Sequence, residues 1–91
     1  MPRIIIDVRS PREYGPRHLA DAINIEFHSP NFVTQMMEFP KDTELITYCN
    51  AGNRAGQAKW RLKSLGFTDV TSYGMMAASV ATGTPVVYEK R

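Results

Sequence analysis

The strongest constraint on the fold is a series of short apolar, β-branched segments separated by helix-like segments. The run RIIIDV at residues 3–8 is apolar at consecutive positions and stops at the polar stretch RSPREYG, residues 9–15. Continuous runs of this kind are typical of strands buried on both faces. Comparable segments follow as DAINIEF (21–27), TELITYC (43–49), FTDVTSYG (67–74) and TPVVYE (84–89). We expect a strand or extended piece at each place and a polar turn over residues 9–15.

Helix signals fill the gaps between these segments. Ser29 is a suitable N-cap and Pro30 suits the first helical position, which predicts a short helix over residues 29–39. A second helix should begin near Asn53 and end with Gly66 as its C-terminal cap. Its apolar residues share one face and its basic residues lie largely on the other: Ala55, Ala58, Leu62 and Leu65 against Lys59, Arg61 and Lys63.

Strands that alternate with helices through short links describe an α/β fold. Such chains form a mainly parallel central sheet with helices on both faces. A third, brief helix is expected over residues 75–83. The chain has 91 residues, enough for one small core, so residues 1–91 should form a single domain.

The net charge of +2 comes from scattered residues rather than from a basic block. No aromatic and basic interleaving resembles a nucleic-acid surface, so we expect no nucleic-acid partner. The longest apolar run is too short to span a bilayer, and no membrane association is predicted. The mild positive balance is compatible with a small anionic substrate. The chain is expected to be a monomer.

Metal binding and export can be judged from a few residues. The two histidines, His18 and His28, with one cysteine, match no structural zinc spacing, so neither a metal nor another cofactor is predicted. Met1 to Arg3 lead directly into the first apolar run without a signal-peptide layout. The protein is therefore expected in the cytoplasm if Met1 is the native start, or in the periplasm if an export signal has been removed.

The candidate functional residues gather in the loop CNAGNRAG, which starts at the only cysteine. Cys49 ends the 43–49 strand, where ligands bind in open parallel sheets, and a helix begins a few residues later. The positive end of that helix favours the thiolate over the thiol. Gly52 lets consecutive amides curl inward as an anion nest, and Arg54 adds a planar cation. The alternative is that Cys49 is a buried, unreactive residue, as a single free cysteine in a small protein most often is.

Three motifs in order give the chain a family resemblance. The loop CNAGNRAGQA resembles the active-site loop of rhodanese-type sulfurtransferases, in particular the small thiosulfate sulfurtransferases with a single domain. Upstream, IIDVRSPREYGPRHLADAINI resembles the first strand of that family and its Asp-x-Arg and Glu-Tyr signatures, and LKSLGFTDVTSYG continues the likeness downstream. The resemblance covers nearly the whole chain and implies a rhodanese-like α/β domain.

The resemblance implies sulfur transfer through a cysteine persulfide. Cys49 as thiolate would attack the outer sulfur of thiosulfate, and a second nucleophile, cyanide in an assay or a thiol in the cell, would remove that sulfur. The donor should be held by Arg54 and by the loop amides of Asn50, Ala51, Gly52, Asn53 and Ala55. Asp7, Arg9 and Glu13 follow the first strand closely enough to form an ion-pair and hydrogen-bond network, and the resemblance implies that this network supports the loop.

Other distinctive residues are given structural roles. His18 is interpreted as a structurally satisfied histidine rather than a general base, and Trp60 as a partly buried helix residue. Met75 and Met76 are interpreted as core residues. The chain departs from the family pattern at Arg17, Asp21, Glu26, Met75, Met76 and Ser79, which leaves the sulfur acceptor open.

Two alternatives stay open. One is a module that carries sulfur or binds a partner without turnover of its own. The other is a cysteine phosphatase or arsenate reductase, because related folds hold phosphate or arsenate with five residues between cysteine and arginine. Here four residues separate Cys49 from Arg54, which predicts a loop too tight for a phosphoryl group.

Overall fold

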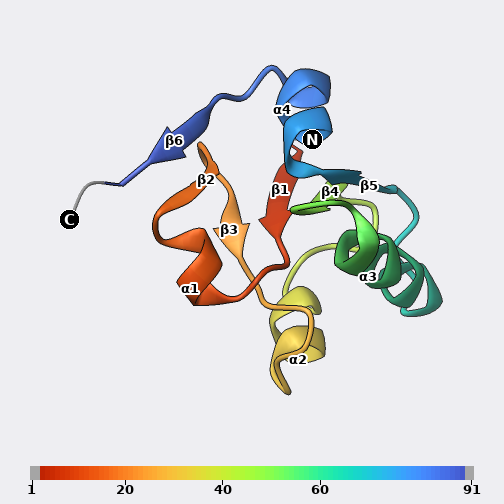
Figure 1. The fold of residues 1–91 in the computed structure, drawn as a ribbon. Coiled ribbons are helices and arrows are strands. Elements are labelled where there is room, and N and C mark those ends of the chain that lie inside the picture. The colour runs from red at the N-terminus through yellow and green to blue at the C-terminus, as the bar shows by residue number, and fades with distance from the viewer. Residues whose placement is uncertain (1–2, 90–91) are drawn as a thin grey trace.

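A computed structural model describes residues 3–89 and has the predicted α/β architecture (Figure 1). Four parallel strands form the main sheet in the order β3-β1-β4-β5. They are β1 (Ile4–Asp7), β3 (Ile23–Asn24), β4 (Leu45–Cys49) and β5 (Val70–Gly74). The helices are α1 (Pro11–Tyr14), α2 (Phe32–Met36), α3 (Asn53–Ser64) and α4 (Met75–Thr82). A separate antiparallel pair consists of β2 (Arg17–Leu19) and β6 (Val86–Tyr88).

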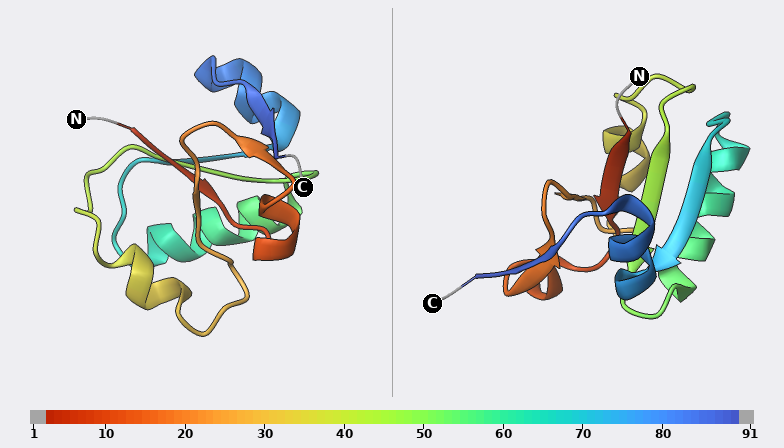
Figure 2. Two further views of the ribbon diagram at one scale, coloured as in Figure 1. Left: turned by 90° about the vertical axis from the view of Figure 1, so that its left-hand side faces the viewer. Right: turned by 90° about the horizontal axis from the view of Figure 1, so that it is seen from above.

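Helices cover both faces of the main sheet, as the pattern of strands and helices predicts. Figure 2 shows α2 and α3 on one side of the sheet and α4 on the other. Successive side chains of a strand point to opposite faces, so β1 and β4 supply both cores. Ile6 and Leu45 pack in the core under α2 and α3, whereas Ile5 and Ile46 pack in the core under α4. The strands are therefore apolar at consecutive positions because each face is buried.

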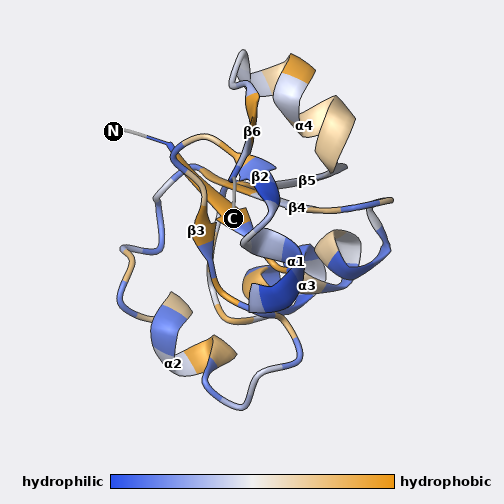
Figure 3. Ribbon diagram, turned by 60° about the vertical axis from the view of Figure 1, so that its left-hand side comes forward, coloured by the Kyte–Doolittle hydropathy of each residue, from blue (hydrophilic) through white to orange (hydrophobic). Residues whose placement is uncertain are grey.

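Helix α2 is shorter than predicted and begins later. Ser29 does not cap it: its Oγ accepts the amide of Asn31 at 3.1 Å, and its carbonyl accepts the amide of Phe32. These bonds form a turn before the helix, whose N-cap is Asn31. The α2 ribbon in Figure 3 alternates hydrophobic and hydrophilic residues, since Phe32 and Met36 are buried and the opposite side faces solvent.

Helix α3 has the predicted bounds and the predicted apolar face. Ala55, Ala58 and Leu62 are buried in it. Gly66 follows the helix with a φ of 104°, the left-handed conformation of a glycine cap. The prediction of a partly buried Trp60 is wrong, because 68% of this residue is exposed. It lies on the outward face, between the buried positions of the helix.

The polar stretch at residues 9–15 is more ordered than a turn. It contains α1, whose N-cap Ser10 and Glu13 form a reciprocal capping box. The strand β2 follows and pairs with β6, so the last extended segment lies outside the main sheet. The predicted strand at residues 21–27 is reduced to β3.

The two methionines at the start of α4 differ in their environment. Met75 is buried, as expected of a core residue, but Met76 is 70% exposed, so that part of the prediction is wrong.

None of the helices within residues 3–89 combines the length and the apolar character needed to cross a membrane. The prediction about Met1 and the start of the chain concerns residues outside the described range.

Candidate active site

Cys49 lies at the carboxyl end of β4, directly before the loop that leads into α3. Its Sγ accepts the amide N–H of Gly52 at 3.0 Å and that of Ala55 at 3.4 Å. Only 1% of the residue is exposed. Two backbone N–H dipoles thus point their positive ends at a buried sulfur, an arrangement suited to hold negative charge at that position.

The loop reaches this geometry through two glycines. Gly52 is the N-cap of α3 and has a φ of 100°, a conformation that side chains with a Cβ rarely adopt. Gly74, at the junction of β5 and α4, lies directly beneath the loop. A Cβ on Gly74 would stand 3.0 Å from the carbonyl oxygen of Asn50, the same oxygen that accepts the amide of Met75. The loop is thus held from below by backbone contact.

Further amide N–H groups of the loop can donate to a bound anion. Within the described residues, the N–H groups of Ala51, Asn53 and Arg54 have no hydrogen-bond partner. These groups lie at or just before the start of α3, where the first N–H groups of a helix have no acceptor within the helix. The loop residues expected to bind the donor, Asn50 to Ala55, are therefore contiguous around Cys49 in the structure.

Arg54 is paired with Glu13 of α1. Its Nη1 and Nη2 donate to Oε1 and Oε2 of Glu13 at 2.8 and 3.0 Å, a bidentate ion pair. The hydrogen bonds from Arg54 are the main cause that lowers the pKa of Glu13 to about 2. The same pair raises the pKa of Arg54. The two side chains that sequence analysis assigned to separate roles, donor binding and loop support, thus form one unit.

A second ion pair lies beneath the loop, fully inside the protein. Arg9 donates to Asp7 through Nε and Nη2, with a shortest distance of 2.7 Å, and both residues are buried. Burial disfavours the charge of Arg9, but the hydrogen bonds and charge of Asp7 outweigh it, so the pKa of Arg9 is raised. Arg9 also donates to Oδ1 of Asn50 at 3.0 Å. Asn50 in turn donates to Glu13, which joins the two ion pairs.

Tyr48 and Asn24 belong to this network, although sequence analysis did not identify them. The hydroxyl of Tyr48 donates to Oδ2 of Asp7 at 2.8 Å and accepts the amide of Leu19. Burial is the main cause that raises the pKa of Tyr48. Asn24 donates to the carbonyl oxygens of Asp7 and Arg9. A polar residue in an apolar strand, directly before the cysteine, is the signal that could have identified Tyr48.

His18 packs against Tyr14 of α1. Its ring stacks on Tyr14 with 3.8 Å between centroids, and its Nδ1 is 2.8 Å from the carbonyl oxygen of Tyr14. Tyr14 itself donates to the carbonyl of Ala22. These contacts are those of a histidine that packs and orders the segment after α1. Within residues 3–89, no three side chains of His, Cys, Asp or Glu gather closely enough to hold a metal ion.

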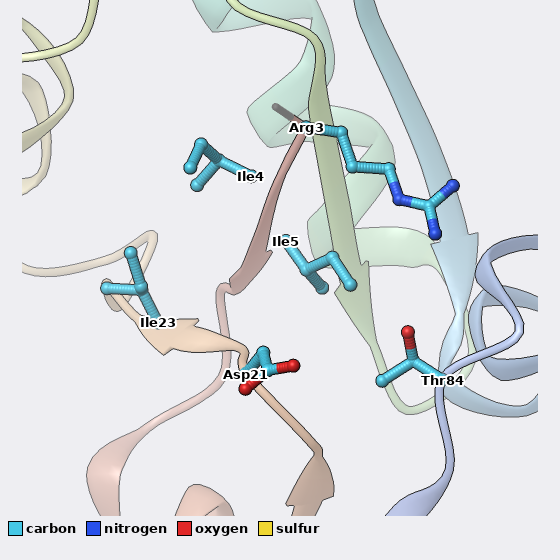
Figure 4. Close-up of a pocket in the computed structure, with 6 residues that line it drawn as sticks. All are labelled: Arg3, Ile4, Ile5, Asp21, Ile23 and Thr84. Atoms are coloured by element: carbon cyan, nitrogen blue, oxygen red, sulfur yellow. The ribbon is translucent and has the colours of Figure 1, made fainter. Parts of the chain in front are cut away.

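A pocket of about 170 Å³ lies elsewhere, at the amino end of the main sheet. Figure 4 shows its lining, which comes from the start of β1, the segment around β3 and the loop before β6. The lining residues are Arg3, Ile4, Ile5, Asp21, Ile23 and Thr84. Cys49 stands at the opposite, carboxyl end of the strands. The nucleophile and its amide donors, rather than this pocket, define the candidate active site.

Comparison with known proteins identifies the class that this fold and this loop define. The family model of the rhodanese-like domain matches residues 1–77, and the chain belongs to that family. A solved structure described as rhodanese with anions from E. coli superimposes with a TM-score of 0.79 at 32% identity, covering 97% of this chain and all of that one (100%).

Two relatives with assigned activities are similar over much of the chain. The thiosulfate sulfurtransferase PspE of Escherichia coli is 38% identical over 69 residues, which cover 76% of this chain and 66% of that protein. The thiosulfate:glutathione sulfurtransferase of Saccharomyces cerevisiae is 32% identical over 81 residues, which cover 77% of this chain and 58% of that protein. The alignments thus span less than two thirds of each relative.

Proposed function

We propose that the protein is a thiosulfate sulfurtransferase in which Cys49 carries the sulfur as a persulfide. The observation that carries this proposal is the pair of amides, from Gly52 and Ala55, directed at Sγ of Cys49. A purely packed cysteine has no need of two donors at its sulfur. Membership of the rhodanese-like family and the activities of two relatives support the same chemistry.

The reaction proceeds by two displacements at one sulfur. The thiolate of Cys49 attacks the outer sulfur of thiosulfate, a new S–S bond forms, and sulfite leaves with the electron pair of the broken bond. Cyanide in an assay, or a thiol in the cell, then attacks the outer sulfur of the persulfide and restores the thiolate. The loop amides of Ala51, Asn53 and Arg54 would hold the terminal sulfur, and Arg54 would orient the anionic donor with the N–H groups that Glu13 does not engage.

Intact-mass measurement tests the proposal directly. After incubation with excess thiosulfate and removal of small molecules, the protein should gain one sulfur atom, roughly 32 mass units, as expected of a persulfide. Cyanide should remove that mass and release thiocyanate. The Cys49→Ser variant should gain nothing, because an alcohol supplies almost no anion at neutral pH. Arg54→Ala should slow the gain of sulfur more than its loss, and Arg54→Lys should restore only part of the rate.

Other outcomes identify the alternatives. A protein that gains the sulfur but passes it to no thiol or cyanide would be a sulfur-carrying or binding module. A protein that never gains the sulfur contradicts the proposal. Hydrolysis of an aryl phosphate through Cys49 would indicate phosphatase chemistry instead, despite the four-residue spacing.

A further inference from the structure

The carboxylate of Glu13 is fixed from two sides at the edge of the candidate active site. From its own helix, Oε1 accepts the amide and the hydroxyl of Ser10, each at 3.1 Å. From the loop, Arg54 donates to both oxygens and Nδ2 of Asn50 donates to Oε2 at 3.1 Å. With this many donors, the carboxylate is held in one orientation beside the loop and stays ionised.

Glu13 also changes the charge that the site presents. Of the ionised side chains in the network, Arg9 is compensated by Asp7 and Arg54 by Glu13. Each cation therefore faces a carboxylate at hydrogen-bond distance, and the four side chains carry no net charge together. Once Cys49 is a thiolate, the site is negative overall, apart from the amide dipoles of the loop.

A donor can contact Arg54 while Glu13 remains in place. A guanidinium has five N–H groups, and Glu13 engages two of them in the structure. The negative charge of Glu13 then acts on the donor throughout binding. Its repulsion grows with the charge of the donor, because the Coulomb energy is proportional to both charges.

We propose that Glu13 determines the charge preference for the sulfur donor. It lowers the efficiency of a dianionic donor relative to a monoanionic donor that transfers the same sulfane sulfur. This inference rests on the proposed function. In chemical terms, thiosulfate is a substrate, but sulfane-sulfur compounds with one negative charge, such as organic thiosulfonates and persulfides, suit the site better.

Two donors with the same reacting sulfur permit the comparison. Thiosulfate passes its outer sulfur to the Cys49 thiolate and leaves as sulfite. Methanethiosulfonate passes its outer sulfur in the same way and leaves as methanesulfinate. In both reactions the S–S bond to Cys49 forms as the bond to the leaving group breaks, and the total charge is unchanged. The donors differ by one negative charge.

The experiment measures kcat/KM for both donors with cyanide as acceptor, in the wild type and in variants. Glu13→Gln should raise the ratio of thiosulfate to methanethiosulfonate on the order of five- to tenfold, because one repelling charge is removed within a few ångströms of the donor. Glu13→Asp keeps the charge but shortens the side chain, so absolute rates should fall while the ratio stays near that of the wild type. Glu44→Gln removes a carboxylate at the opposite end of β4 and should leave the ratio unchanged.

The ratio of the two kcat/KM values separates the effect of charge from a loss of loop order, because a disordered loop would lower kcat/KM for both donors alike. An unchanged or lowered ratio in Glu13→Gln overturns the inference, as does a raised ratio in Glu13→Asp. Salt supplies a test without any variant: in the wild type the ratio of thiosulfate to methanethiosulfonate should rise between 20 and 200 mM salt, because screening weakens the repulsion of the dianion more than that of the monoanion. A ratio that falls with salt also overturns the inference. Absence of sulfur transfer from either donor contradicts the proposed function itself.

Discussion

Two glycines place the loop of the candidate active site, and they do so for different reasons. Gly52 supplies a backbone conformation, with φ at 100°, that begins α3 in the direction needed for its amide to contact Cys49. Gly74 supplies space, because a Cβ there would stand only 3.0 Å from the carbonyl oxygen of Asn50. Neither function depends on the side chains of the loop. The amides that contact Sγ therefore depend on two residues without side chains.

Alanine substitutions should distinguish this requirement from the general cost of replacing glycine. In Gly74→Ala the new Cβ displaces the carbonyl of Asn50, so kcat/KM should fall at least about tenfold and the free energy of unfolding by about 1–3 kcal/mol. Gly56→Ala is the control, since a Cβ there meets nothing within 4 Å inside α3. It should keep its activity and gain about 0.5–1 kcal/mol of stability. Activity of Gly74→Ala equal to that of Gly56→Ala would contradict the role given to Gly74.

At the scale of elements, α3 joins the chemistry to the core. Its first turn supplies Ala55, whose amide contacts Cys49 and whose carbonyl accepts the hydroxyl of Thr47 at 3.1 Å. Its buried face anchors the helix on the sheet through Leu62. Trp60 makes no such contribution, because its side chain is exposed. The Nζ atoms of Lys59 and Lys63 lie 5.7 and 5.9 Å from the centroid of its ring.

A matched pair of variants on α3 compares the contributions of its buried and exposed faces to stability. Leu62→Ala removes a fully buried side chain and should lower the free energy of unfolding by about 2–5 kcal/mol. Trp60→Ala removes a larger but exposed side chain and should change it by no more than about 0.5 kcal/mol. Urea unfolding followed by far-UV circular dichroism measures both. A large loss of stability in Trp60→Ala would mean that the indole is packed after all.

At the scale of the whole molecule, the site is assembled from segments that are far apart in the sequence. Glu13 in α1 meets Arg54 in α3, and Asp7 in β1 meets Tyr48 in β4. The bonds that support the loop are therefore formed only when the sheet and its helices are in place. The ion pair between Glu13 and Arg54 is partly exposed, with 31% and 30% of the two side chains accessible. Its contribution to stability is accordingly reduced by solvent screening.

Acid should weaken the fold through Glu13 in a defined direction. Its pKa falls from an ordinary value of 4.5 to about 2 in the folded protein. The stabilisation is therefore fully present above pH 5 and is lost as the pH falls towards 2. After allowance for screening, Glu13→Gln should be less stable than the wild type by about 1 kcal/mol at pH 7, and this difference should vanish near pH 2. Urea unfolding at a series of pH values measures it, and a difference independent of pH would refute the assignment.

Strong local patterns in the sequence specify several elements and the position of the nucleophile. Consecutive apolar residues specify β1 and β4 because both faces of these strands are buried, and the spacing of Ala55, Ala58 and Leu62 specifies α3. Cys49 was identifiable because glycine, arginine and a helix start follow it within a few residues. These are signals that neighbouring residues carry, so no knowledge of distant contacts was needed.

Contacts between residues far apart in the sequence follow from how the elements pack together. The pairing of Arg54 with Glu13 and of Tyr48 with Asp7 joins residues 41 positions apart in each case, and no local pattern encodes such contacts. The exposure of Trp60 and Met76 was decided in the same way, because whether an apolar side chain is covered depends on what packs over it. The strand β6 lies outside the main sheet for a similar reason, because it pairs with β2, a segment far from it in the sequence.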